Sequence, residues 1–489
     1  MKSKTLQLVY VLMGFLSFII MIALFDFGTG YENAQIVAAA AVMMSVLWIT
    51  EAIPLFVTSL LPLVLFPLTG ALSAKEISEA YMNSTIFLFM GGFIIAIGME
   101  RWNLHKRIAL NIINIVGTTP AKIIFGFMCA STFISMWISN TATAVMLLPI
   151  GLSIIQKLEN EFSVEKSKKF SLALMLGIAY SCSIGGVATL IGTPPNLVFQ
   201  RVYKITFPNN PEILFDDWMK FAVPLSIIML LFVWFLLTKI FFKTNDDIII
   251  DKEIIKNEKQ QLGLMSFEEK VVSILFFITA MLWIFRAELD LGLFKIPGWS
   301  TLLPDASFID DGTVAMAMAI LLFVIPTKSK SAGQNFLLDF SAIKNIPWDI
   351  ILLFGGGFAL AEGFVSSNLS ELIGEQFYSL KGMNIVFLIA AICFVITFLT
   401  ELTSNTATAQ ILLPILAALS IQMEVSPLIL MVPATLSASF AFMLPVATPP
   451  NAIVFGSRRI RVVDMARTGL IINLTGVVLI TFIVWLFFL

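Results

Sequence analysis

Long apolar runs recur along this chain, and no other feature of the sequence constrains its fold as strongly. Runs of about 18 or more residues appear from Leu8 to Leu489, and a helix needs about 20 apolar residues to cross the hydrocarbon core of a bilayer. Apolar residues make up 58% of the chain and charged residues 13%, whereas soluble domains have roughly 45–50% and 25%. The sequence therefore predicts an all-α membrane protein, whose first run, near residues 7–25, is a membrane helix rather than a removed signal peptide.

The spacing of the apolar runs predicts about eleven transmembrane helices and two re-entrant helical hairpins. The expected spans lie near residues 8–25, 34–50, 54–70, 85–100, 170–200, 218–242, 268–287, 312–327, 347–365, 427–456 and 468–489, and the hairpins near 120–156 and 383–422. With the N-terminus inside and each hairpin entering and leaving on one side, most of the 30 Lys and Arg residues fall on the inner side. Because positive charge concentrates there, we expect a cytoplasmic (inner) membrane protein with its N-terminus inside and its C-terminus outside.

Three polar or glycine-rich motifs occur twice, in the same order. They are Phe89-Met-Gly-Gly-Phe93 and Phe354-Gly-Gly-Gly-Phe358, Ser139-Asn-Thr-Ala-Thr143 and Ser404-Asn-Thr-Ala-Thr408, and Gly192-Thr-Pro-Pro-Asn196 and Ala447-Thr-Pro-Pro-Asn451. The first two pairs are 265 positions apart and the third 255, as the residue numbers show. Under the expected topology the two copies run in opposite directions, which predicts an inverted repeat. A duplication retained only for packing is the alternative, but packing would favour repeated apolar residues.

Each Ser-Asn-Thr lies in the middle of an otherwise apolar run, so we expect two half-helices that meet at a polar tip. The N-terminus of the second half-helix presents free N–H groups that suit an anionic carboxylate. The C-terminus of the first presents free carbonyls that suit a hard cation. The Pro-Pro motifs predict a similar break in two further spans, because proline lacks an N–H and clashes with the preceding turn. An ordinary kink is the other interpretation of either Pro-Pro alone.

At these motifs the chain resembles the divalent anion/sodium symporter family, whose members carry C4-dicarboxylates, citrate or sulfate. The stretch Pro445–Val454 looks like the family's signature, and the likeness spans nearly the whole chain. The resemblance implies a homodimer in which a transport domain moves like an elevator against a scaffold. It would make 1–115 and 268–382 the scaffold, 116–243 and 383–489 the transport domain, and 244–267 a cytoplasmic linker.

The resemblance also implies site residues, carried over position by position. The substrate would contact Asn140, Thr141 and Thr193 in the first half, and Ser404, Asn405, Thr406, Thr448 and Pro449 in the second. The first cation site would use Ser135, Ser139, Asn140 and the backbone of Gly192, and the second Thr400, Thr403, Asn405 and the backbone of Ala447. Glu401, next to Thr400, is either a functional intramembrane carboxylate or a structural one held by backbone donors.

The expected function is secondary transport of a small dianion such as succinate, malate or fumarate, by sodium-coupled symport. Cation-independent dicarboxylate exchange is the alternative within the same family. We expect no enzyme, because the sequence has no HExxH motif and its single histidine, His105, lies on a stretch expected to be cytoplasmic. We also expect no cofactor other than Na+ as coupling ion, and no nucleic-acid partner.

Overall fold

The computed structural model is predominantly helical and describes residues 4–243, 253–290, 295–329, 335–376 and 382–489. The helices of the first half are α1 (Lys4–Leu24), α2 (Glu32–Thr50), α3 (Leu55–Thr58), α4 (Leu61–Thr69), α5 (Ala74–Tyr81), α6 (Ser84–Arg101), α7 (Leu104–Val116), α8 (Pro120–Ser135), α9 (Asn140–Phe162), α10 (Val164–Gly186), α11 (Pro194–Thr206) and α12 (Phe215–Phe235), which a π-helical turn, Leu236–Phe241, extends. Those that follow are α13 (Glu253–Gln261), α14 (Phe267–Ile284), α15 (Asp311–Val324), α16 (Phe340–Lys344), α17 (Trp348–Ser366), α18 (Leu369–Gln376), α19 (Ile385–Leu399), α20 (Asn405–Gln422), α21 (Pro427–Ala438), α22 (Pro449–Gly456) and α23 (Val462–Phe488).

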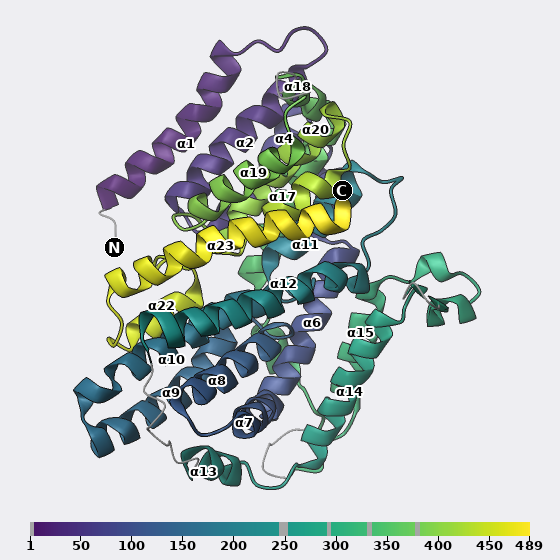
Figure 1. The fold of residues 1–489 in the computed structure, drawn as a ribbon. Helices are drawn as coiled ribbons and strands as arrows, with labels where there is room; N and C mark the ends of the chain where they lie inside the picture. Colours follow the sequence, from purple (N-terminus) through teal and green to yellow (C-terminus); the bar gives the residue numbers. More distant parts are fainter. Residues whose placement is uncertain (1–3, 244–252, 291–294, 330–334, 377–381) are drawn as a thin grey trace.

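Between α14 and α15 the chain forms a small excursion that stands away from the helices (Figure 1). It contains the short antiparallel strands β1 (Leu289–Asp290) and β2 (Lys295–Ile296) and two 3-10 turns, Trp299–Leu302 and Ala306–Phe308. The predicted linker 244–267 contains α13, and its residues 244–252 lie outside the described part of the chain.

Nine helices in the described part of the chain are long and apolar enough to cross a membrane. The first of them, α1, lies at the edge of the molecule against α2 (Figure 1). Its outward side chains are large and apolar, and Leu8, Leu12 and Leu16 are more than half exposed. Such a surface suits lipid rather than water. The predicted all-α membrane fold is confirmed, while the number of crossings stays a prediction.

The chain leaves the helical conformation at all four places marked by the repeated polar motifs. Helix α8 ends at Ser135 before α9 begins at Asn140, and α19 ends at Leu399 before α20 begins at Asn405. Longer non-helical segments, 187–193 and 439–448, separate α10 from α11 and α21 from α22. The Pro-Pro pairs stand in the first turn of α11 and α22, where a missing N–H costs nothing. The prolines therefore begin the second helix of each pair, and the break itself lies before them.

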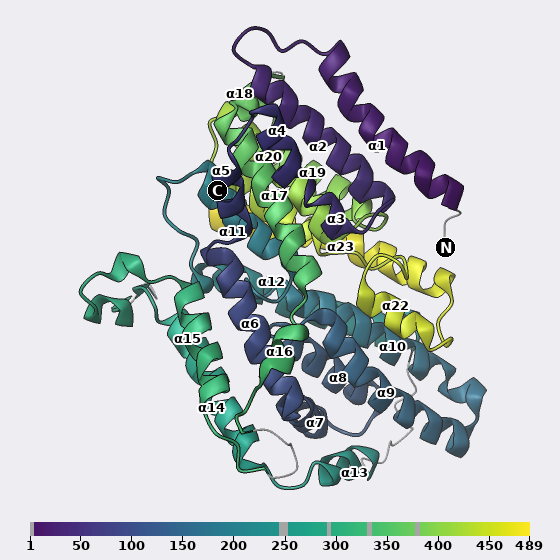
Figure 2. The same cartoon turned by 180° about the vertical axis from the view of Figure 1, so that it is seen from behind.

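The glycine-rich motifs of the two halves meet inside the molecule. The rings of Phe89 on α6 and Phe354 on α17 lie edge to face with centroids 4.8 Å apart. Helix α17 runs past α3 and α5 through the middle of the view in Figure 2. A Cβ on Gly91 would come within 2.6 Å of Ala315, and one on Gly355 within 2.0 Å of the Tyr81 ring. These glycines let neighbouring helices approach closely enough to hold the two halves together.

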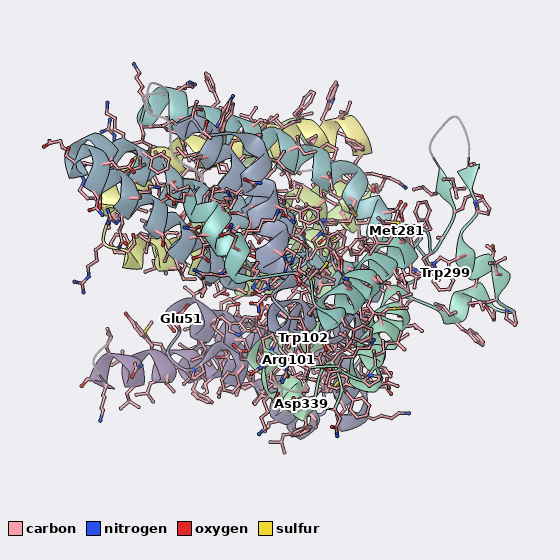
Figure 3. The ribbon with its side chains drawn as sticks, turned by 90° about the horizontal axis from the view of Figure 1, so that it is seen from below. Glu51, Arg101, Trp102, Met281, Trp299 and Asp339 are labelled. Atoms are coloured by element: carbon pink, nitrogen blue, oxygen red, sulfur yellow. The ribbon has the colours of Figure 1, made fainter. Side chains whose placement is uncertain are left out.

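Polar contacts between distant parts of the chain also join the halves. Arg101 pairs with Asp339 at 3.3 Å, and beside it the Trp102 indole donates to the Leu337 carbonyl at 3.0 Å (Figure 3). Arg459 likewise forms a two-pronged ion pair with Glu159, one contact measuring 3.0 Å. The two halves are therefore bound by charge as well as by apolar packing.

Candidate functional site

A cavity of about 730 Å³ lies where the four helix breaks converge. All eight residues predicted to contact substrate line it: Asn140, Thr141, Thr193, Ser404, Asn405, Thr406, Thr448 and Pro449. Of the predicted cation ligands, Ser139, Asn140, Gly192, Thr403, Asn405 and Ala447 line it as well. The other two, Ser135 and Thr400, are fully buried and stand behind the wall. Residues 265 positions apart in the sequence thus meet around one space.

Four helices begin at this cavity, and each brings its electropositive N-terminus to the wall. Ser139 and Ser404 cap α9 and α20 by accepting from the third backbone N–H of their helices, at 3.2 and 3.5 Å. Thr193 and Thr448 stand in the same capping position before α11 and α22. Because α11 and α22 open on two prolines without N–H groups, α9 and α20 offer more free donors to an anion. The Ser-Asn-Thr tips are therefore the better anion-binding ends.

The residues predicted to bind the first cation are held together by a hydrogen bond and by the close approach of two glycines. The Ser135 hydroxyl donates to the Asn140 side-chain oxygen. A Cβ added to Gly186 would lie 2.6 Å from that oxygen, and one added to Gly192 would lie 2.5 Å from the Gly186 carbonyl. A side chain at Gly192 would collide with the Gly186 backbone, so glycine is needed where the non-helical segment passes the end of α10. The result is a cluster of neutral hydroxyl, amide and carbonyl oxygens.

The second set repeats this arrangement with different residues. The Thr400 hydroxyl lies 2.7 Å from the Asn405 side-chain oxygen and 2.8 Å from the Ala438 carbonyl. The Thr403 hydroxyl contacts that of Thr408 at 2.6 Å. Helix α19 ends just before these groups, so its last carbonyls and electronegative end face the same region. Both clusters have the oxygen chemistry by which broken helices hold Na+ in transporters.

The asparagines of the Thr-Pro-Pro-Asn motifs hold the non-helical segments in shape. The Asn196 amide donates to the carbonyls of Gly186 and Thr189, at 3.3 and 2.7 Å. Asn451 donates to Ala441 and Leu444, each at 3.1 Å. Both asparagines are fully buried. This role was not predicted from the sequence. The available signal was an amide side chain placed just after a predicted helix break.

The remaining wall of the cavity is apolar except for two acids. It includes Phe89 and Phe93 of α6, and Trp137 and Leu402, which precede the two tips. None of these four was predicted to line the cavity. Trp137 and Leu402 look like ordinary membrane-helix positions, and the repeated motif that contains Phe89 and Phe93 did not indicate which way their rings point. The charged residues among the described lining are Glu51 and Asp349, and none is Lys, Arg or His. An anion here is therefore met by hydrogen-bond donors and helix ends rather than by a fixed positive side chain.

Comparison with known families matches the chain, over residues 3–489, to the family described as the sodium:sulfate symporter transmembrane region. The chain belongs to this family. The resemblance inferred from the repeated motifs is thereby confirmed. Relatives in the sodium:sulfate symporter family include a protein of Staphylococcus saprophyticus called sodium-dependent dicarboxylate transporter SdcS, 43% identical over 484 residues, or 98% of this chain and 91% of the relative. SdcS of Staphylococcus aureus strain bovine RF122 is 42% identical, with the same coverage of both chains.

Solved structures show a related fold at much lower sequence identity. MtrF of Neisseria gonorrhoeae, described in a study of antimetabolite efflux pumps, superposes with a TM-score of 0.56 at 12% identity, covering 99% of this chain and 94% of its own. The YdaH transporter of Alcanivorax borkumensis gives a TM-score of 0.54 at 12% identity, covering 84% of this chain and 85% of its own. At this identity the likeness concerns the fold alone.

We predict that Asn451→Ala lowers the stability of the purified protein. The change removes the Asn451 donor from the buried Ala441 carbonyl, whereas the Leu444 carbonyl keeps the Ala447 N–H. An unsatisfied buried acceptor costs about 1–3 kcal/mol. Thermal unfolding in detergent measures the effect. Asn209→Ala, which changes an exposed asparagine, is the matched control. Equal melting temperatures for the two variants would refute the role given to Asn451.

Proposed function

We propose that this protein carries a C4-dicarboxylate together with Na+ across the cytoplasmic membrane. The observation that carries the proposal is the convergence of both Ser-Asn-Thr tips on one cavity, with oxygen clusters directly behind them. The names of relatives 42–43% identical over almost the whole chain, sodium-dependent dicarboxylate transporters, support both the substrate class and the coupling ion. The same relatives favour symport over cation-independent exchange.

In this proposal a dianion such as succinate, malate or fumarate bridges the two tips. One carboxylate would accept from the α9 N-terminus, Asn140, Thr141 and Thr193, and the other from the α20 N-terminus, Ser404, Asn405, Thr406 and Thr448, with Pro449 in van der Waals contact. Two separated tips suit a ligand with two anionic ends better than a compact oxyanion such as sulfate. Neutral donors hold the dianion without so deep an energy well that release becomes slow.

Sodium would occupy the oxygen clusters behind the tips. The first ion would be held by Ser135, Ser139, Asn140 and the Gly192 carbonyl, and the second by Thr400, Thr403, Asn405 and the Ala447 carbonyl. Each asparagine belongs to both sets, so a bound cation orients the amide that faces the substrate. The charge of the dianion is then balanced by ions that travel with it. This shared asparagine is the physical basis that we propose for coupling.

The movement that we propose is an elevator, in which 116–243 and 383–489 slide against a scaffold of 1–115 and 268–382. The family likeness supports this division and a homodimer. The apolar runs and the placement of Lys and Arg support about eleven crossings, two re-entrant hairpins and an N-terminus inside. Under that orientation Glu51 and Asp349, two exposed residues of the cavity lining, would lie on the cytoplasmic side.

Reconstituted protein should take up radiolabelled succinate into empty proteoliposomes only when an inward sodium gradient is present. The reason is that the dianion meets no basic side chain in the described cavity lining and needs the cations to balance its charge. Uptake is compared in sodium and in choline buffers. Uptake that ignores sodium and requires internal dicarboxylate would establish exchange instead.

Changing Asn140 or Asn405 to Ala should abolish sodium-driven succinate uptake, because each amide serves both the substrate and one cation. Both side chains are only half-buried, so the melting temperature of the purified protein should change little. Asn210→Ala, at an exposed position outside the cavity, serves as the control. Wild-type transport by both cavity variants would remove these residues from the site.

The elevator predicts that a bridge between Glu212 and Arg286 stops transport. Glu212 lies in the proposed transport domain and contacts Arg286 of the proposed scaffold at 3.4 Å, so a link between these positions would join the two bodies. Cysteines would be placed at both positions after Cys129, Cys182 and Cys393 are replaced by serine, and joined by a reducible thiol cross-linker. Uptake should cease on cross-linking and return on reduction. Unchanged uptake after verified cross-linking would count against relative movement of the two domains.

A further inference from the structure

The buried carboxylate of Glu401 joins three separate elements in the second half. One oxygen accepts from the Met443 backbone N–H and from the Asn473 amide, each at 2.8 Å, and the other accepts from the Leu444 N–H at 3.0 Å. Glu401 is 3% exposed and Asn473 fully buried. The second tip, the non-helical segment before α22 and the last helix α23 are therefore fastened at one point.

The first half has a hydrogen bond between the equivalent positions. Met136 precedes Glu401 by 265 positions, the separation of the two Ser-Asn-Thr motifs, while Thr189 precedes Leu444 by 255, the separation of the Thr-Pro-Pro-Asn motifs. The Thr189 hydroxyl donates to the Met136 carbonyl at 2.5 Å. The same two positions are thus joined in both halves, through different atoms.

The last helix of the first half also has a hydrogen bond at the position equivalent to Asn473. Trp218 of α12 precedes Asn473 of α23 by the same 255 positions. Its indole N–H donates to the Val187 carbonyl in the first non-helical segment at 2.8 Å. Asn473 donates instead to Glu401. In each half hydrogen bonds therefore link the tip, the non-helical segment and the last helix, through neutral groups in the first half and through the Glu401 carboxylate in the second.

The contacts of Glu401 also lead to the second oxygen cluster. Leu444, held through its N–H by Glu401, accepts at its carbonyl from the Ala447 N–H at 3.2 Å and from the Asn451 amide at 3.1 Å. Thr400 is the neighbour of Glu401 in the chain. Each of the three groups bonded to the carboxylate donates an N–H to it. An ionised carboxylate can accept all three, because it has two acceptor oxygens and no proton of its own.

We propose that Glu401 and Asn473 are positioning residues for the second sodium site, and that the first site is held independently by Thr189 and Trp218. The proposal rests on the sodium-coupled function argued above. Glu401 touches neither substrate nor ion. It sets the distance between Thr400 on the tip and the Ala447 carbonyl in the non-helical segment, so its loss loosens one cation site and leaves the other intact.

The first test measures how succinate uptake depends on sodium in the variant Glu401→Gln. In this variant an amide nitrogen replaces one carboxylate oxygen and would face a backbone N–H that it cannot accept from. The sodium concentration for half-maximal succinate uptake should rise about tenfold or more, as when partners that orient metal ligands are lost, while the maximal rate at saturating sodium stays close to that of the wild type. Asn473→Ala removes one of the three donors and should give a smaller rise. An unchanged sodium dependence in both variants would overturn the proposal.

Two further variants separate positioning from general loss of structure. Glu401→Met should raise the sodium requirement, and adding Leu444→Thr should restore it in part, because the pair recreates the Thr189–Met136 bond of the first half. Failure of this rescue would count against the idea that the two hydrogen-bond links play equivalent roles in the two halves. Thr189→Val is the matching variant in the first half, because it removes the hydroxyl that donates to the Met136 carbonyl.

Hydrogen exchange tests the structural part of the proposal separately from sodium coupling. If the wild type proves independent of sodium, the proposed coupling is refuted, while exchange rates still show whether Glu401 and Thr189 each hold one half. Glu401→Gln should speed exchange in 399–405 and 440–447 and leave 134–141 and 186–193 at wild-type rates. Thr189→Val should do the reverse. Equal effects of either variant on both halves would overturn the independence of the two sites.

Discussion

The structure depends on the requirement that a polypeptide in hydrocarbon satisfy every backbone N–H and C=O within the protein. A helix meets this requirement along its length but leaves free groups at its ends. Here two tips and two non-helical segments, 187–193 and 439–448, bring such ends into the interior. The buried amides of Asn196 and Asn451 bond the carbonyls of those segments. The groups left at the helix ends face the cavity, where a ligand can bind them.

The repeat explains why polar groups can be confined to one place in so apolar a chain. Each half supplies a tip, a non-helical segment and a last helix, and the cavity lies between the two sets. The halves are not identical where they fasten these parts together. A Cβ on Gly186 would come within 2.6 Å of the Asn140 side-chain oxygen, whereas the equivalent position in the second half is Ala441. Glu401 likewise replaces the carbonyl of Met136 as acceptor, so one architecture is stabilised by two chemistries.

Much of this arrangement followed from sequence. The apolar runs predicted the all-α membrane fold, the repeated Ser-Asn-Thr motifs predicted the helix breaks, and the family likeness supplied residues that now line one cavity. The part played by Pro-Pro was only partly foreseen, because proline tells that a helix is interrupted and not whether it ends one helix or begins the next. The wall residues Trp137 and Leu402 were missed, since an apolar residue in a membrane helix carries no mark of which neighbour it faces. Phe89 belonged to a repeated motif, but the motif did not indicate that it faces the cavity.

The sequence alone determined that the chain is a membrane protein, that its polar motifs occur in duplicate and that they interrupt its helices, because composition and spacing are properties of the chain itself. Tertiary structure decided what the polar residues do. Glu401 could have been a functional or a structural acid, and only the folded chain brings Met443, Leu444 and Asn473 to its two oxygens. Hydrogen bonds between residues 42 to 72 positions apart depend on how the helices pack. The spacing of residues within one motif does not determine that packing.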